Sequence, residues 1–173
     1  MIRKYFIFLI PVILGSLLFT HCRKQALISS TPSIQYLGYT KISYQNFNAD
    51  SLLYLQFSFE DGDGDIGLEL SDTASPFRLG ERYYYNVFAE YQAGKAGVYS
   101  YIINGTDTVN YNDRISNIQP ETRNKAINGI ITLKIEPIVG TIVPDSIQFK
   151  IYLVDRALHQ SNIISTGPIP VNY

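Results

Sequence analysis

The chain has no tryptophan, one cysteine (Cys22) and two histidines (His21 and His159). A single cysteine cannot form a disulfide within the chain, which excludes a small secreted domain stapled by disulfides. So few cysteines and histidines also cannot build a multi-histidine zinc site. A catalytic Cys/His pair is excluded as well if the one thiol is modified, as argued below.

The sequence also lacks an excess of charge of either sign. It contains no recognisable catalytic motif. Lys and Arg total 14 against 15 Asp and Glu, without a basic cluster, which argues against a nucleic-acid-binding protein. Ser161 lies close to His159, but a hydrolase also needs an oxyanion hole and an elbow such as G-x-S-x-G, and neither is present. No spacing of glutamates singles out a catalytic pair of carboxylates. We therefore expect a protein that is not an enzyme.

A strongly apolar, charge-free run lies near the N-terminus. The stretch "YFIFLIPVILGSLLFT", residues 5–20, follows Arg3 and Lys4, and a basic segment before an apolar one is typical of a secretory signal peptide. A proline and a glycine interrupt the run, which is shorter than the about 20 residues of a membrane-spanning helix. We expect residues 1–21 to be a signal peptide, with a retained N-terminal anchor as the alternative.

Cys22 stands at the position where a bacterial lipoprotein signal peptide is cut. Here the chain resembles a diacylated lipoprotein, although His21 replaces the small residue of that pattern. The resemblance implies that Cys22 carries the lipid (palmitate) and tethers the domain to a membrane. Residues 22–33 are polar and small, which predicts a flexible tether. Arg23 and Lys24 favour a periplasm-facing protein on the outer membrane of the bacterial cell envelope, since surface-exported lipoproteins often carry acidic residues there.

From the end of the tether onward, apolar residues alternate with polar ones, which is the period of β-strands. Leu53 and Leu55, for example, alternate with Tyr54 and Gln56. No segment has a convincing helical period. The strands that we expect cover residues 34–43, 52–60, 82–92, 97–103, 106–111, 131–135, 146–155 and 162–171. The pattern thus predicts an all-β domain over 34–173, an antiparallel sandwich of about seven or eight strands.

Two tight turns are expected in the middle of the chain. The segment 94–97 closes the first hairpin, and Asn104-Gly105 is a strong signal for a two-residue type I′ turn in the second. The segment 112–128 has no strand pattern. We expect it to be a functional loop or a crossover between the sheets.

The stretch "FSFEDGDGDIG", residues 57–67, places Asp61, Asp63 and Asp65 at alternate positions directly after a predicted strand. In a loop that glycine lets curl, such carboxylates can point at one hard cation, and calcium takes six to eight oxygens at about 2.3–2.6 Å. Without a cation, three neighbouring carboxylates would repel one another by about 1 kcal/mol per pair or more. We predict a structural calcium ion here, with an ordinary Asp-Gly turn as the alternative.

The loop does not fit an EF-hand. Counted from Asp61, the sixth position, where the EF-hand needs glycine, is Ile66, and Gly67 comes one place late. The residues before the loop have strand period, so no helix enters it. Glu69 and Asp72 fall at the ninth and twelfth positions, and we consider them only as additional ligands.

A second segment, "YLVDRALHQSNI" at 152–163, has Asp155 at the end of a predicted strand and Asn162 at the start of the next. It resembles the D-x-A-G-N-x-S turn between the last two strands of many bacterial immunoglobulin-like domains. Leu158 and His159 stand where Gly-Asn would be, which removes the usual turn glycine.

That resemblance implies an immunoglobulin-like sandwich, in which the strands 52–60 and 146–155 run in the same direction and end at the same pole. We therefore expect Asp155 and Asn162 to lie beside the aspartate loop and to complete the calcium shell. A salt bridge with Arg156 or a turn cap is the alternative for Asp155.

The apolar run with Cys22 and the motifs "FEDGDGDIG" and "DRALHQSN" together resemble a group of small, uncharacterised Bacteroidetes-type lipoproteins with an immunoglobulin-like domain. The resemblance covers most of the chain after Cys22 and is specific at the two loop motifs. It implies a fold and a lipid anchor, but no activity.

Tyrosines concentrate in the predicted meander. Tyr83, Tyr84, Tyr85 and Tyr91 could anchor a protein partner or stack on sugars. Alternatively, they cover half-buried sheet, because tyrosine favours strands. We expect a non-enzymatic, lipid-anchored envelope protein, a structural or protein-binding module whose partner is an unknown envelope protein. The alternative is a glycan-binding accessory lipoprotein that uses the tyrosine-rich meander.

Overall fold

The computed structural model describes residues 28–43, 50–118, 126–136 and 143–172. The strands in this part of the chain are β1 (Ser33–Ser43), β2 (Asp50–Asp61), β3 (Val87–Lys95), β4 (Val98–Tyr101), β5 (Ile103–Asn104), β6 (Asp107–Thr108), β7 (Ile127–Ile135), β8 (Ser146–Leu153), β9 (Ile164–Ser165) and β10 (Ile169–Pro170). One 3₁₀ turn, η2 (Arg82–Tyr84), precedes β3. The all-β prediction is confirmed. The predicted signal peptide and Cys22 lie outside the described residues.

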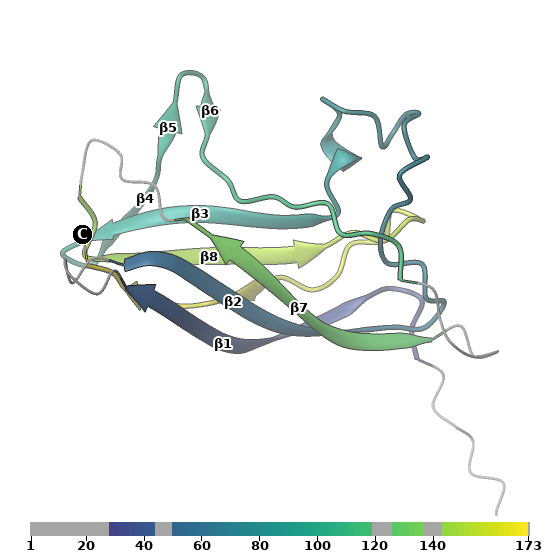
Figure 1. Cartoon of the computed structure of the whole chain (residues 1–173), viewed down its shortest axis with the longest axis horizontal. Helices are drawn as coiled ribbons and strands as arrows, with labels where there is room; N and C mark the ends of the chain where they lie inside the picture. Colours follow the sequence, from purple (N-terminus) through teal and green to yellow (C-terminus); the bar gives the residue numbers. More distant parts are fainter. Residues whose placement is uncertain (1–27, 44–49, 119–125, 137–142, 173) are drawn as a thin grey trace, which may run out of the picture.

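The strands form two antiparallel sheets that pack face to face (Figure 1). One sheet has the order β1-β2-β7, and the other has the order β10-β8-β3-β4, with β9 also paired to β8. A three-stranded sheet thus faces a five-stranded one. The chain crosses between the sheets after β2 and again before and after β7, as in an immunoglobulin-like sandwich. β5 and β6 form a separate hairpin that projects from the sandwich (Figure 1). In the described part of the chain, no helix is long and apolar enough to cross a membrane.

The core lies between the two sheets and follows the alternation in the sequence. Leu55 and Phe57 of β2 are completely buried, and so are Tyr91 of β3 and Phe149 of β8, which face them from the other sheet. Successive side chains of a strand point to opposite faces. The residues between them, such as the exposed Gln56, therefore lie on the outer faces.

One predicted strand starts too early. The sequence predicts a strand from residue 82, but β3 begins at Val87, and Arg82–Tyr84 form η2 instead. Tyr83 packs against an apolar cluster on the outer face of the sheet, formed by Phe88, Tyr152 and Val154. Tyrosine's preference for strands reflects packing on a sheet surface, and at Tyr83 the chain reaches that surface from a turn.

The two hairpin turns differ from each other. Ala96 and Gly97, both with positive φ of 51° and 80°, join β3 to β4 as in a type I′ turn, within the predicted segment. The second turn lies one residue later than predicted, because Asn104 pairs with Asp107 and leaves Gly105-Thr106 as the loop. Of these two, only Gly105 has a positive φ, 66°, which is the pattern of a type II′ turn.

Three further segments differ from the prediction. The expected strand at 97–103 is split between β4 and β5, and the one at 162–171 between β9 and β10. Part of the expected linking segment 112–128 pairs with Val87 and Leu68 through isolated bridges. These short pairings connect the loops to the sheets without extending them.

β2 and β8 end at the same end of the sandwich (Figure 1), which confirms the expected placement of the two loop motifs. We call this end, with its loops 61–67 and 155–163, the aspartate pole. The described chain begins here, because Ser29 accepts a hydrogen bond from the Gly62 N–H at 2.8 Å. The folded domain therefore includes residues assigned to the tether, and its predicted start at residue 34 is too late.

Candidate metal centre

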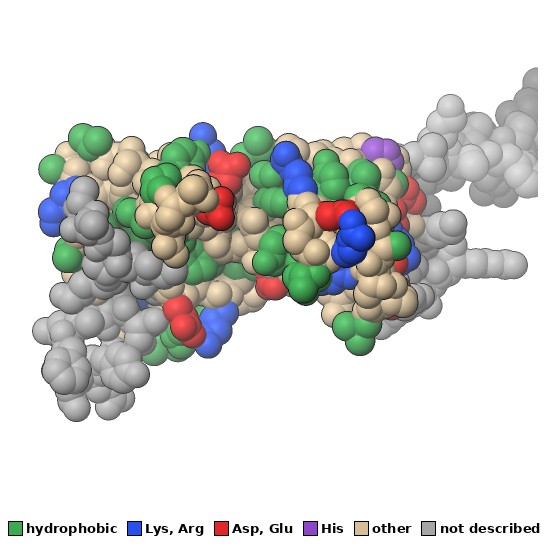
Figure 2. Space-filling model, turned by 90° about the horizontal axis from the view of Figure 1, so that it is seen from above, with side chains coloured by type: hydrophobic (Ala, Val, Ile, Leu, Met, Phe, Trp, Pro, Cys, Tyr) green, Lys and Arg blue, Asp and Glu red, His purple; other side chains and the backbone are tan. Residues whose placement is uncertain are grey.

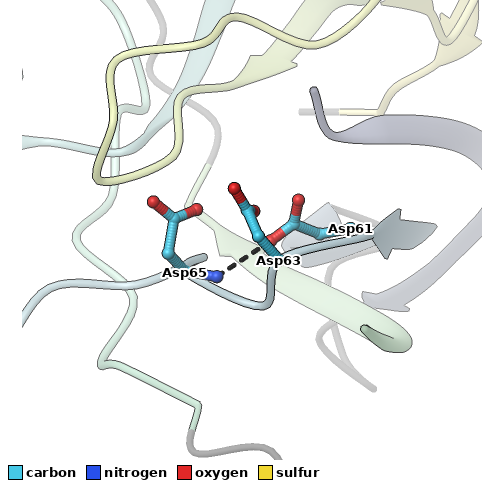
Figure 3. Close-up of side chains that lie close together, drawn as sticks. All are labelled: Asp61, Asp63 and Asp65. Carbon is cyan, nitrogen blue, oxygen red and sulfur yellow. Dashed lines mark hydrogen bonds between the residues drawn. The ribbon is translucent and has the colours of Figure 1, made fainter. Parts of the chain in front are cut away.

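Asp61 is the last residue of β2, and the loop after it carries Asp63 and Asp65. One carboxylate oxygen from each lies within 4.8 Å of the others, and the carboxylates point to the same side of the loop (Figure 3). Two oxygens bound to one calcium ion are at most about 5 Å apart. The three side chains therefore have the spacing of a calcium site before any rearrangement.

Glycine is required at three places in this loop, and at Gly62 a Cβ would collide with the backbone carbonyl oxygens of Ile28 and Ser29. Gly64 has a φ of 71° and Gly67 a φ of 100°, in the left-handed region that other residues rarely adopt. A Cβ on Gly67 would also collide with the carbonyl oxygen of Ser116. Gly64 lets the chain turn between Asp63 and Asp65, and Gly67 lets it turn away again after Ile66, so that alternate side chains can reach the same point.

The three carboxylates are incompletely satisfied. Asp61 is completely buried, and its Oδ2 accepts a hydrogen bond from the Asp65 N–H at 3.0 Å. The Oδ1 atoms of Asp61, Asp63 and Asp65 are buried without a hydrogen-bond partner. Buried polar atoms in folded proteins nearly always have a partner. Three unpartnered oxygens on the same side of one loop therefore fit a cation-binding site.

The pKa values report the same crowding. Burial, and next the carboxylate of Asp63, raise the pKa of Asp61 from 3.8 to about 6, against the opposite effect of the Asp65 N–H. Burial, followed by the carboxylates of Asp155 and Asp63, raises the pKa of Asp65. Like charges held out of water disfavour ionisation, and a divalent cation would remove that penalty.

The turn after β8 is joined directly to the aspartate loop. The carbonyl of Asp65 accepts a hydrogen bond from Arg156 N–H at 3.2 Å, and its Oδ2 accepts one from Ala157 N–H at 3.1 Å. Asp155, 1% exposed, is close enough to raise the pKa of Asp61 and Asp65. It is not among the three residues whose oxygens lie within 4.8 Å.

Asp155 also caps its own turn, which was the alternative considered for it. Its Oδ1 accepts the His159 N–H at 2.7 Å, and its Oδ2 lies 3.0 Å from His159 Nδ1. Each carboxylate oxygen has two lone pairs, so capping leaves Asp155 able to bind a cation as well. Leu158, which replaces the usual turn glycine, adopts a positive φ of 69°.

Asn162 has a different role from the one expected. Its Oδ1 accepts the Ile34 N–H at 2.8 Å, and its Nδ2 donates to the Ile34 carbonyl at 2.9 Å. The side chain thus continues the pairing of the edge strand β1. We leave Asn162 out of the proposed ligand set, because its two hydrogen bonds hold the side chain against the backbone of β1, whereas Asp155 is close enough to the loop to raise the pKa of Asp61 and Asp65.

Glu69 and Asp72, the additional candidates, are engaged elsewhere. Glu69 Oε1 accepts a hydrogen bond from Asn117 Nδ2 at 2.6 Å. The Asp72 carboxylate accepts the Glu69 N–H at 2.8 Å and pairs with Arg156 at 2.6 Å. Both therefore brace the loop between β2 and β3.

Two residues that hold this region escaped the sequence analysis. Asn86, 3% exposed, donates from Nδ2 to the Ile115 carbonyl at 3.0 Å and accepts the Ile115 N–H at 2.8 Å. Arg114 donates to the Tyr84 carbonyl at 2.8 Å, and its guanidinium lies 4.9 Å from the centre of the Tyr84 ring. Their partners are distant in the sequence, and no local pattern indicates them.

The predicted tyrosine surface is only partly present. Tyr91 is completely buried against Tyr111 and Phe149, so its assignment to a surface is wrong: its position in β3 faces the other sheet. Tyr83 and Tyr84 are half-buried, and Tyr85, 37% exposed, packs edge-on against Tyr84 at 5.1 Å.

Comparisons with known proteins add no assignment: no protein-family model, no curated protein and no solved structure matches the chain.

Proposed function

We propose that this protein is a non-enzymatic, lipid-anchored protein of the bacterial cell envelope. Its immunoglobulin-like sandwich is stabilised at the aspartate pole by one calcium ion, and it serves as a structural or protein-binding module. Asp61, Asp63 and Asp65 hold the ion, with Asp155 as a further ligand. Calcium supplies no chemistry here beyond neutralising and crosslinking these carboxylates.

The observation that carries the calcium proposal is the set of three buried, unpartnered Oδ1 atoms of Asp61, Asp63 and Asp65. One oxygen of each residue lies within 4.8 Å of the others. At such separations each pair of charges repels by about 3 kcal/mol or more if the effective dielectric constant is about 20. A plain turn gains nothing that offsets such repulsion. A calcium ion converts it into attraction and satisfies the orphaned oxygens.

A structural role follows from what the loop touches. Gly62 is hydrogen-bonded to Ser29 at the start of the described chain, and Leu68 to Ile115 in the segment before β7. Asp65 is bonded to Ala157 in the turn after β8. An ion at the centre of this loop would stabilise three segments that come together only at the aspartate pole.

The lipid anchor and the envelope location are supported by the sequence alone. Cys22 follows the apolar run 5–20, and the described domain begins a few residues later, at Ile28. A domain joined so closely to a lipidated cysteine would be held near the membrane, where it could contact an envelope partner. Palmitate labelling that survives Cys22→Ser would contradict this part of the proposal.

The serine and histidine that lie close together in the sequence are not arranged as a nucleophile and its base. The Ser161 hydroxyl, near His159 in sequence, donates to the Asn162 carbonyl at 2.8 Å and accepts the Leu153 N–H at 2.9 Å. Ser161 is 5% exposed. Its oxygen is part of the strand pairing and out of reach of a substrate.

A glycan-binding accessory lipoprotein is the alternative function. The exposed Tyr85 favours it, but Tyr91 is in the core and Tyr83 and Tyr84 are packed against neighbours. Glycan screening of the protein with Tyr85→Ala distinguishes the two, since loss of a glycan signal on substitution would favour the alternative.

Thermal unfolding of the full chain, with millimolar calcium or with a chelator, tests the calcium proposal. A ligand at about 100 times its Kd adds about 2.7 kcal/mol of stability, and for a domain of this size we expect Tm to rise by about 5–10 °C. Asp63→Asn should lose most of the rise, while Asp107→Asn, exposed in β6, should keep it. An equal rise in both variants, or none in the unsubstituted chain, would overturn the proposal.

A further inference from the structure

Two leucines in the loop between β2 and β3 are unusually exposed. Leu70 is 94% and Leu79 is 75% exposed, the highest values among the large hydrophobic residues that the structure describes. Scattered exposed leucines are common and need no explanation. These two differ because each lies in a hydrogen-bonded tight turn.

The turn Glu69–Asp72 presents Leu70. Asp72 N–H donates to the Glu69 carbonyl at 3.1 Å, and the Asp72 carboxylate accepts the Glu69 N–H at 2.8 Å. Arg114 Nη2 donates to the carbonyls of Glu69 and Asp72 at 3.0 and 3.1 Å. Arg156, from the turn after β8, pairs with Asp72 at 2.6 Å. The backbone around Leu70 is therefore fixed to the aspartate pole.

The turn Arg78–Glu81 presents Leu79 in a similar way. The Glu81 N–H donates to the Arg78 carbonyl at 2.9 Å, and the two side chains form an ion pair at 2.8 Å. Gly80, with a φ of 90°, supplies the left-handed residue of a type II turn and puts Leu79 at its first central position.

A leucine fixed in this way is well suited to enter an apolar phase. Burying one leucine side chain gains about 1.5–3 kcal/mol. Since the two turns are already ordered, little conformational entropy is lost when they bind. In water, the same exposure contributes nothing to the stability of the fold.

The position of the loop indicates what would cover these leucines. The loop lies at the same end of the sandwich as the start of the described chain (Figure 1). Five residues separate Ile28 from Cys22, and they span at most about 20 Å when fully extended. In the space-filling view, hydrophobic side chains at this end are exposed among charged ones of both signs (Figure 2).

We propose that Leu70 and Leu79 insert into the interfacial region of the lipid bilayer, so that the aspartate pole faces the membrane and the projecting β5–β6 hairpin is held away from it. This inference rests on the proposed lipid anchor at Cys22. A second copy of the chain, which could also cover the leucines, is an outcome of the test.

The test uses the absence of tryptophan from the chain. Leu70→Trp and Leu79→Trp each introduce a single fluorescent probe. Val98→Trp, at a position 72% exposed at the far end of β3 and β4, is the matched control. Each full-length variant is reconstituted into vesicles of phosphatidylethanolamine and phosphatidylglycerol containing a brominated lipid, which quenches tryptophan within the bilayer. Palmitate on Cys22 is measured in the same preparations.

We expect a blue shift and quenching by about half for the probes at 70 and 79, and neither change at 98, since interfacial segments reach about 5–10 Å into the bilayer. Equal, weak quenching at all three positions would overturn the proposal that Leu70 and Leu79 insert into the bilayer. A blue shift without quenching, growing with the protein-to-lipid ratio, assigns the leucines to a second copy and also overturns it. If the chain carries palmitate but its probes are not quenched, insertion of the leucines is contradicted and the lipid anchor is not. If the probes are quenched but the chain carries no palmitate, only the lipid anchor at Cys22 is contradicted. A chain that fails to bind vesicles contradicts both.

Discussion

The carboxylate of Asp65 accepts a hydrogen bond from the Ala157 N–H at 3.1 Å, although the two residues are 92 positions apart in the chain. This contact joins the loop after β2 to the turn after β8. It places the two sequence motifs in one structural unit, because the parallel directions of β2 and β8 bring both to the aspartate pole.

Asn162→Ala tests whether Asn162 holds β1 in place or binds the metal ion. The substitution removes the two hydrogen bonds with Ile34 and should lower the free energy of unfolding by about 1–2 kcal/mol. Calcium affinity should stay within about twofold, because Asn162 is outside the proposed ligand set, whereas Asp63→Asn should weaken it about tenfold or more. Calorimetric titration of both variants checks this. If Asn162→Ala weakens calcium binding as much as Asp63→Asn, Asn162 is a ligand after all.

Asn86→Ala should be strongly destabilising. It removes two buried hydrogen bonds and leaves the Ile115 N–H without its partner, a loss of about 2–3 kcal/mol. Urea unfolding measures it. Asn110→Ala, at an exposed position, is the control and should change the stability by no more than about 0.5 kcal/mol. Equal stability of the two variants would mean that Asn86 does not hold the segment before β7.

Leu158→Gly should stabilise the turn after β8. Leu158 has a positive φ of 69° and is 40% exposed, and such a conformation costs a non-glycine residue about 1–2 kcal/mol. Glycine removes that strain, but about 0.5–1 kcal/mol of the gain is offset because glycine loses more chain entropy on folding. We expect Tm to rise by about 1–4 °C. Leu158→Ala keeps the strain and should show no rise, so a similar rise in both would point to loss of the side chain instead.

The pH dependence of stability should change sign with calcium. In the metal-free protein, burial and then Asp63 raise the pKa of Asp61 from 3.8 to about 6, so ionising it costs more in the folded than in the unfolded state. Stability should therefore fall as the pH rises from about 4 to about 6, by at most about 3 kcal/mol for this group. Calcium binds the ionised carboxylates, so with excess calcium stability should rise over the same window. Urea unfolding across this range, with chelator and with calcium, checks both slopes, and identical slopes would contradict the shared site.

The sequence predicts this fold well wherever a local period decides it. Leu53, Leu55 and Phe57 alternate with polar residues and are buried as expected. The start of β3 is predicted less well, because Tyr83 and Tyr84 have strand propensity but are held in a turn by distant groups. Tyr84 accepts a hydrogen bond from Arg114, and Arg82 donates to the Tyr152 hydroxyl at 3.3 Å.

The candidate site is also predicted only in part, where spacing along the chain decides which residues meet. Asp61, Asp63 and Asp65 follow from their spacing, because three alternate residues of one loop need only glycines to converge. The partners from the second motif depend on tertiary structure: Asp155 lies near the loop, while Asn162, only seven residues later, clamps β1. Asn86 and Arg114, which brace the region, bind backbone groups far along the chain. Such contacts depend on how the sheets pack, and no periodic pattern in the sequence indicates them.

Direct titration of calcium into the metal-free full chain by isothermal calorimetry tests the central claim. We expect one ion to bind per chain, with an affinity about tenfold or more weaker in both Asp61→Asn and Asp63→Asn and unchanged in Asp107→Asn. Absence of binding heat at more than one temperature, with an unchanged Tm in millimolar calcium, would contradict it and leave the aspartate loop as a turn.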